Sequence, residues 1–152
     1  MSAPRPMAFT CHEFVSGVVA SWLAFLGLLA LGLTLMAIIA GDITWAAVYL
    51  MVGIPIGAVV AAIVALLGAP AVWYIGRALA DVPQRGIHLA VYAALGAVLG
   101  TSVVTISALT TAGDIGAALA SPHAVYVIAA CTIALMSGWA WGSRRSPRIS
   151  AG

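Results

Sequence analysis

The chain has 152 residues, of which 64% are hydrophobic and only 7% are charged, with a formal net charge of +2. A soluble domain is excluded, because so few polar side chains cannot cover the surface of a folded domain in water. One transmembrane helix needs roughly 20 apolar residues to cross the hydrocarbon core of a bilayer. The composition therefore predicts an all-α integral membrane protein, a four-transmembrane-helix bundle in a single membrane domain over residues 1–152.

The first two predicted spans cover residues 14–40 and 43–67. The first apolar run is much longer than the roughly 7 to 15 residues of a signal-peptide core, so we interpret it as a signal anchor that stays in the protein. Gly41 and Asp42 are expected to turn the chain between the two spans. The second span is expected to end near Pro70, which lacks the amide donor that a continuing helix needs.

The segment that follows the second span has a mixed character. Its apolar residues recur at helical spacing, whereas Arg77, Asp81 and Arg85 are charged. This pattern predicts a short interfacial helix that leads into a cytoplasmic loop. In the alternative interpretation, the second span continues through a kink at Pro70 as far as Ile75.

The third and fourth predicted spans cover residues 87–112 and 123–141. The loop between them contains Gly113, Ser121 and Pro122, which are typical loop and helix-capping residues. These boundaries leave the last residues of the chain as a polar tail.

The basic residues are all arginines, and their positions predict the orientation. If the N-terminus lies in the cytoplasm, every arginine falls on the cytoplasmic side, including those of the basic tail 142–152, and neither outer loop contains one. The six are Arg5, Arg77, Arg85, Arg144, Arg145 and Arg148. We therefore expect a multi-pass protein of the inner (plasma) membrane with both termini cytoplasmic.

Small residues recur at every fourth position on the predicted spans. Because helices in lipid associate through close backbone approach, such stripes are typical of helix-packing faces. The candidate packing residues are Gly53, Gly57, Ala61 and Ala65 on the second span, Gly96 and Gly100 on the third, and Ala130, Ala134 and Gly138 on the fourth. Stripes on several spans favour a tight bundle or an oligomer.

The deep parts of the predicted spans contain no Asp, Glu, Lys or Arg. Ion-coupled transporters and intramembrane hydrolases usually need a protonatable or metal-binding group at depth. No phosphate loop, nucleophile elbow or zinc-ligand spacing is found either. We expect no catalysis, no cofactor and no metal, and we expect Cys11 and Cys131 to be free thiols.

Three residues near the predicted inner edge keep alternatives open. Glu13 precedes the first span, where an interfacial anchor or a pair with Arg85 is favoured over a role in proton coupling. His12 and His88 fall at the same edge, so a bis-histidine haem is a less favoured alternative that optical spectroscopy would test.

Hydroxyl side chains are frequent on the third span. Thr101, Ser102 and Thr105 fall within about 100° of arc on a helix and form a candidate polar path. In the favoured alternative, these hydroxyls bond to carbonyls of the preceding turn or to neighbouring helices.

The tetrapeptide Ala-Gly-Asp-Ile occurs at residues 40–43 and again at 112–115. The predicted topology places each copy at the outer end of an outward-going span, where glycine adopts the left-handed conformation after a helix. Asp42 or Asp114 is then expected to cap the next segment. We interpret the copies as matching outer turns, and a shared cation site of Asp42 and Asp114 is a less favoured alternative.

No residue pattern identifies an activity. The apolar spans and small-residue stripes favour a non-catalytic accessory or structural subunit that packs, within the lipid bilayer, against other membrane proteins or copies of itself. No nucleic-acid partner is expected. The alternative is a small pore, permease or holin-like protein lined by the hydroxyls of the third span.

Overall fold

The computed structural model describes residues 11–41, 43–80, 82, 84–111 and 113–144. These residues form helices and no strands. The helices are α1 (Cys11–Ile39), α2 (Thr44–Ala78), α3 (Arg85–Thr110), α4 (Ile115–Leu119) and α5 (Pro122–Arg144). All except α4 are long and apolar enough to cross a membrane. The predicted all-helical class with four long apolar helices is confirmed.

A tight turn joins α1 to α2. Gly41 has a φ of +74°, a left-handed conformation that glycine adopts at little cost. Its amide donates to the carbonyl of Ile38 at 3.0 Å. The first Ala-Gly-Asp-Ile copy thus ends α1 with a left-handed glycine, as its sequence predicts, while Asp42 lies outside the described residues.

The second Ala-Gly-Asp-Ile copy has a different backbone. Among the described glycines only Gly41 has a positive φ, and the amide of Gly113 instead donates to the carbonyl of Ala108 at 2.9 Å. Asp114 is extended and starts α4, where its carboxylate accepts a hydrogen bond from the amide of Gly116 at 2.8 Å. The expected left-handed glycine is therefore present at Gly41 but not at Gly113, whereas the expected cap by Asp114 is confirmed.

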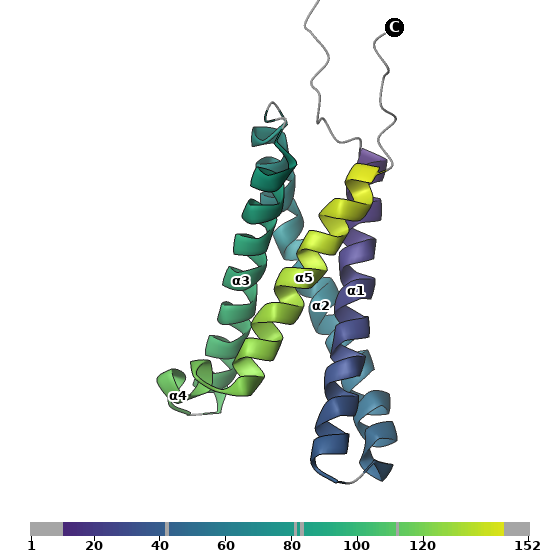
Figure 1. Cartoon of the computed structure of the whole chain (residues 1–152), viewed down its shortest axis with the longest axis vertical. Coiled ribbons are helices and arrows are strands. Elements are labelled where there is room, and N and C mark those ends of the chain that lie inside the picture. Colours follow the sequence, from purple (N-terminus) through teal and green to yellow (C-terminus); the bar gives the residue numbers. More distant parts are fainter. Residues whose placement is uncertain (1–10, 42, 81, 83, 112, 145–152) are drawn as a thin grey trace, which may run out of the picture.

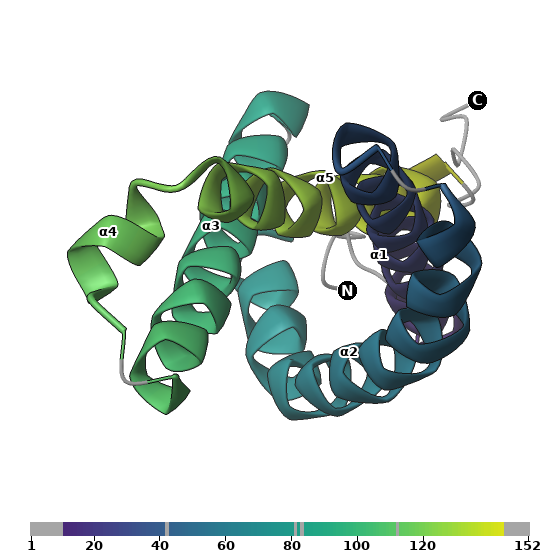
Figure 2. The same cartoon turned by 90° about the horizontal axis from the view of Figure 1, so that it is seen from below.

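α2 is one continuous helix through Pro55 and Pro70. Each proline leaves the carbonyl four residues earlier without its usual amide donor, and such sites bend helices. Figure 2 shows the resulting curve of α2 around one side of the bundle. The second helix does not end near residue 67. The residues expected to form a separate interfacial helix continue α2 through the proline, as in the alternative interpretation, and reach Ala78.

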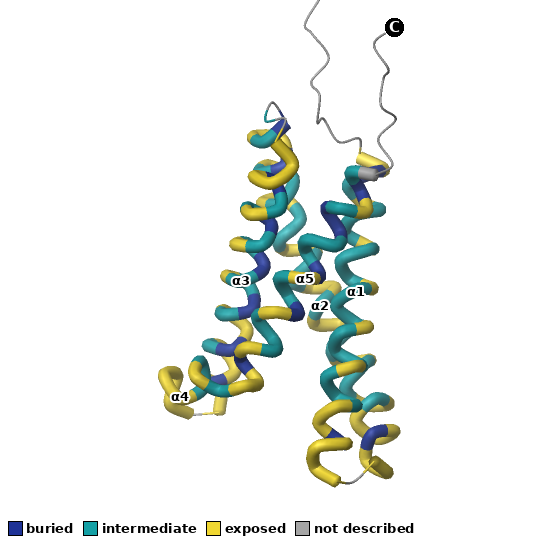
Figure 3. The backbone as a smooth tube through the Cα atoms, viewed as in Figure 1, coloured by how far each residue is buried: buried dark blue, intermediate teal, exposed yellow. Residues whose placement is uncertain are grey.

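α5 lies between α3 and α1 (Figure 1), on the side of the bundle opposite to α2 (Figure 2). It packs against both α1 and α3, whereas the backbone of α2 approaches α1 closely and no other helix of the described chain. The buried residues of α3 recur at every fourth position: His88, Tyr92, Gly96, Gly100, Val104 and Ala108. Figure 3 shows the buried positions concentrated along α3 and α5, while α1 and α2 are mostly exposed or half-buried.

The two ends of the bundle differ in charge. α1 and α3 begin, and α2 and α5 end, at what we call the basic end, because Arg77, Arg85 and Arg144 lie there. The opposite end, formed by the turn at Gly41 and by α4, is called the loop end.

Candidate functional site: an apolar cavity among the long helices

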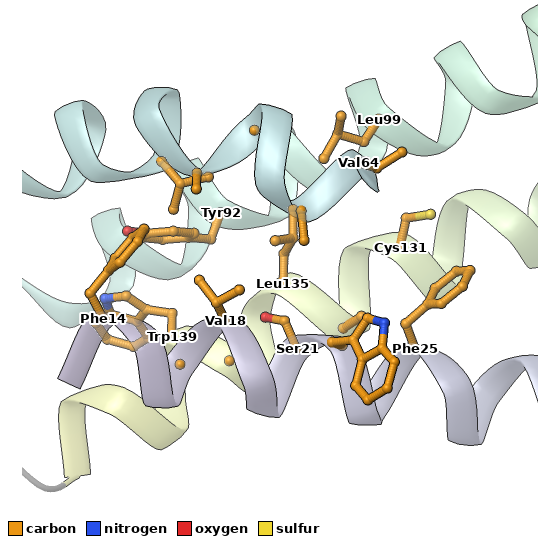
Figure 4. Close-up of a pocket in the computed structure, with 18 of the residues that line it drawn as sticks. Phe14, Val18, Ser21, Phe25, Val64, Tyr92, Leu99, Cys131, Leu135 and Trp139 are labelled. Atoms are coloured by element: carbon orange, nitrogen blue, oxygen red, sulfur yellow. The ribbon is translucent and has the colours of Figure 1, made fainter. Parts of the chain in front are cut away.

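A cavity of about 330 Å³ lies among α1, α2, α3 and α5. Figure 4 shows its mainly apolar walls. They include Val18 and Phe25 of α1, Val64 of α2, Leu99 of α3 and Leu135 of α5. The cavity exists because the curved α2 approaches only α1 with its backbone and stays apart from α3 and α5.

The basic end of the cavity carries its charged groups. Among the described lining residues, the only formally charged ones are Glu13 and Arg77. Glu13 is buried, with 8% of its surface exposed, whereas Arg77 is exposed. The Arg77 guanidinium lies 5.8 Å from the centroid of the Trp73 ring, which in turn meets Phe14 edge to face at 5.0 Å between centroids. We call this end of the cavity, formed by Glu13, Phe14, Trp73 and Arg77, the rim.

A stack of His88 on Trp139 joins α3 to α5 beside this rim. The two ring centroids are 5.4 Å apart and the rings are inclined by 20°. His88 is fully buried, and its Nε2 lies 2.9 Å from the carbonyl oxygen of Val82. Because a carbonyl only accepts, Nε2 donates this hydrogen bond.

Two buried polar atoms of this stack have no hydrogen-bond partner, namely Nδ1 of His88 and Nε1 of Trp139. Trp139 is 8% exposed, and it lines the cavity together with Tyr92 and Phe14 (Figure 4). Leaving a buried N–H unsatisfied costs about 1–3 kcal/mol, and most buried polar groups avoid it. The indole N–H of Trp139 is therefore an unsatisfied donor within the packed stack of α3 on α5.

The predicted packing glycines of α3 lie against α5 of the same chain. A Cβ at Gly96 would come within 2.5 Å of the Thr132 Cα, and one at Gly100 within 2.6 Å of the Ile128 Cα. Such contacts leave no space for a side chain, so these two residues set the separation of the helices.

The small residues of α2 lie in two different environments. Gly53 and Gly57 face leucines of α1, because a Cβ at either would collide with Leu33 or Leu29. One and two turns further on, Ala61 and Ala65 line the cavity. The stripe thus packs on α1 in its first half and borders open space in its second half.

On α5 the predicted residues Ala130, Ala134 and Gly138 are buried. Gly138 lies against Gly17 and Ser21 of α1. The small-residue faces of α3 and α5, and the first half of the α2 stripe, therefore have partners within one chain.

The hydroxyls of the candidate polar path do not line the cavity. α3 contributes Tyr92, Leu99 and Val103 to its wall, whereas Thr101 and Thr105 are half-buried elsewhere on the helix. Ser102 is exposed, and its Oγ donates to the carbonyl of Val98 at 2.8 Å. Ser102 thus bonds to the preceding turn, as in the favoured alternative.

The remaining candidate residues are separated. His12 is exposed and lines a shallow groove between α1 and α5 with Val15 and Trp141, while His88 is buried against Trp139. Cys11 and Cys131 are free.

The structure describes only one of the two acids of the alternative cation site. Asp114 caps α4, and its proposed cation partner Asp42 lies outside the described residues. No group of three or more His, Cys, Asp and Glu side chains that could hold a metal occurs in the described part of the chain.

Sequence reasoning missed the importance of Trp139 and of the cavity. The spacing of four between His88, Tyr92 and Gly96 was available as a sign of one buried face. The cavity itself had no sequence signal, because it depends on how α2 is placed relative to helices that it does not contact.

Fold and site together define a helical protein with four candidate membrane spans around an apolar cavity that has charged residues at one end. Comparisons of the chain with protein-family models, curated proteins and solved structures gave no match.

Proposed function

We propose that the chain is a non-catalytic subunit of an inner-membrane complex, with the basic end and both termini in the cytoplasm. The position of α2 carries this proposal. α2 packs on α1 alone within the described chain and presents a continuous row of large apolar side chains, including Ile56, Val59 and Ile63, each more than half exposed. In lipid such a face is available to a transmembrane helix of another protein.

The orientation rests on the charges of the basic end. Arg77 and Arg85 flank the connection between α2 and α3, and Arg144 ends α5. Arginines accumulate on the cytoplasmic side of membrane proteins, so this end is assigned to the cytoplasm. Cysteine accessibility labelling at the two ends in intact cells tests the assignment, and labelling from outside at residue 145 contradicts it.

The partner is tested by purification of the tagged chain in lipid nanodiscs without crosslinker. We expect another membrane protein in stoichiometric amount. Triple replacement of Ile56, Val59 and Ile63 by alanine should release it.

A matched triple replacement on the exposed face of α1, at Val19, Leu23 and Leu31, should retain the partner. These residues are similarly apolar and exposed. Recovery of a pure homo-oligomer that makes liposomes leak a small dye would contradict the proposal and favour a pore instead.

A further inference from the structure

The size and chemistry of the cavity point to a ligand with a long apolar part. At about 330 Å³ it falls within the range of small-molecule pockets, which begins near roughly 300 Å³. Walls such as Val64, Leu99 and Leu135 offer no hydrogen bonds, and apolar cavities of this kind stay dry and take apolar ligands.

The surroundings of the cavity favour a ligand that enters from lipid. The cavity lies among four helices that are long and apolar enough to cross a membrane, and α2 does not approach α3 closely with its backbone. A molecule that is already dissolved in the bilayer can therefore reach it laterally, whereas a water-soluble one would have to cross the charged rim.

Polar groups occur mainly at one end of the cavity, so the ligand is expected to be amphiphilic with its polar part there. Arg77 is exposed at this end, and its planar guanidinium suits a phosphate group. The rings of Trp139 and Tyr92, which both line the cavity, lie 6.3 Å apart between centroids at the same end of the wall.

The carboxylate of Glu13 would repel an anionic headgroup, so the net accessible charge at the rim decides whether a phosphate is attracted there. Glu13 is buried and already takes part in an interaction within the structure, while Arg77 keeps donors exposed beside Trp73. A second cation, Arg85, is exposed at the same end of the bundle. The accessible charge of the basic end is therefore positive, which complements a phosphate.

We propose that the cavity binds one acyl chain of an anionic phospholipid, with the chain along Val64 and Leu135 and the phosphate at Arg77. This binding is a property of the isolated chain, so it holds or fails independently of the protein partner proposed above.

Native mass spectrometry of the purified full chain in detergent tests the proposal. Phosphatidylglycerol and phosphatidylcholine with identical acyl chains are added in turn, and the lipids retained by each chain are counted. We expect one retained phosphatidylglycerol and about fivefold weaker retention of phosphatidylcholine. The choline cation of phosphatidylcholine offsets the charge of its phosphate, whereas the net negative charge of phosphatidylglycerol gains on the order of 1 kcal/mol from one nearby arginine. Equal retention of the two lipids would overturn the role of Arg77.

Filling the cavity is the second part of the test. Ala65→Phe places a ring in the cavity, whereas Ala62→Phe, on the exposed face of the same helix, is the matched control. Ala65→Phe should abolish lipid retention and Ala62→Phe should preserve it. Retention by both variants would show that lipid binds elsewhere, and a dimer that Ala65→Phe dissociates would show that a second copy fills the cavity.

Two milder variants keep the proposal testable if Ala65→Phe fails to fold. Arg77→Gln should lower the preference for phosphatidylglycerol about fivefold, whereas Arg85→Gln, which does not line the cavity, should change it less. Trp139→Phe replaces the indole at the same end of the wall by a smaller phenyl ring, which removes apolar contact and should weaken retention of both lipids. Unchanged binding in both Arg77→Gln and Trp139→Phe would overturn the proposed headgroup site.

Discussion

Gly138 of α5 lies directly against Gly17 of α1, so that a Cβ at Gly138 would come within 2.5 Å of the Gly17 carbonyl oxygen. The same added Cβ would collide with the hydroxyl of Ser21. The backbones of α1 and α5 therefore touch near the basic end. No larger residue fits at Gly138 unless the two helices separate.

Gly138→Ala should destabilise the bundle by about 1–3 kcal/mol, the usual cost of inserting a methyl group into a close-packed contact. Thermal unfolding followed by circular dichroism in a mild detergent measures the change. Gly27→Ala is the matched control, because a Cβ at Gly27 has no neighbour within 4 Å. Its expected effect is neutral or slightly stabilising, since alanine favours helix over glycine. Equal melting temperatures of the two variants would show that α1 and α5 are not in contact there.

Gly96→Ala should weaken the packing of α3 on α5 within one chain. The added methyl group meets the Thr132 backbone, which cannot rotate away as a side chain can. We expect a loss of about 1–3 kcal/mol in unfolding free energy, with no change in oligomeric state by light scattering. Gly68→Ala, where a Cβ again has no neighbour within 4 Å, serves as the control. Dissociation of an oligomer by Gly96→Ala alone would contradict the placement of this glycine.

Tyr126→Phe should remove a link between α5 and α1, because the Tyr126 hydroxyl donates to the carbonyl of Leu28. A partly buried hydrogen bond of this kind contributes on the order of 1 kcal/mol. Gly32→Ala should have a larger effect, since its Cβ would lie 2.5 Å from the Tyr126 ring. Chemical unfolding of both variants is compared with that of Tyr74→Phe, which alters a side chain that is 75% exposed. A Tyr74→Phe effect as large as that of Tyr126→Phe would argue against the link.

His88→Phe should preserve the stack on Trp139 but remove the donor that binds the Val82 carbonyl. We expect a loss of about 1 kcal/mol in stability and faster proteolysis of the connection between α2 and α3. His12→Phe changes an exposed histidine at the same end and should leave both measurements unchanged. If proteolysis of the two variants proceeds at one rate, His88 does not hold this connection.

The helical class and the four long helices were predictable, because composition and run length decide them directly. The end of α1 at Gly41 was predictable for the same kind of reason, since glycine there permits a left-handed turn. The continuation of α2 past Pro70 was only an alternative. Proline usually ends a helix in water, but within transmembrane helices it is tolerated when neighbours compensate the lost hydrogen bond.

The candidate site was less accessible to sequence reasoning. Glycines such as Gly96 predicted close helix packing, but their spacing does not indicate whether the partner is α5 or another copy of the chain. The pairing of His88 with Trp139 joins residues far apart in the sequence, and neither has a motif. The hydroxyls of α3 predicted a polar path because hydroxyl groups are polar. In the structure, Ser102 donates to a carbonyl of its own helix, and the apolar side chains of Leu99 and Val103 line the cavity instead.

The contacts of α5 with both α1 and α3 have a consequence for the order in which the helices assemble during synthesis. α1 and α2 are neighbours in sequence and can pair as soon as both have left the ribosome. α3 contacts neither of them in the described chain and depends on α5 to join it to α1. A nascent chain that stops before Pro122 should therefore hold one paired hairpin and one solitary helix in the membrane, and quality-control proteases should degrade it faster than the finished protein.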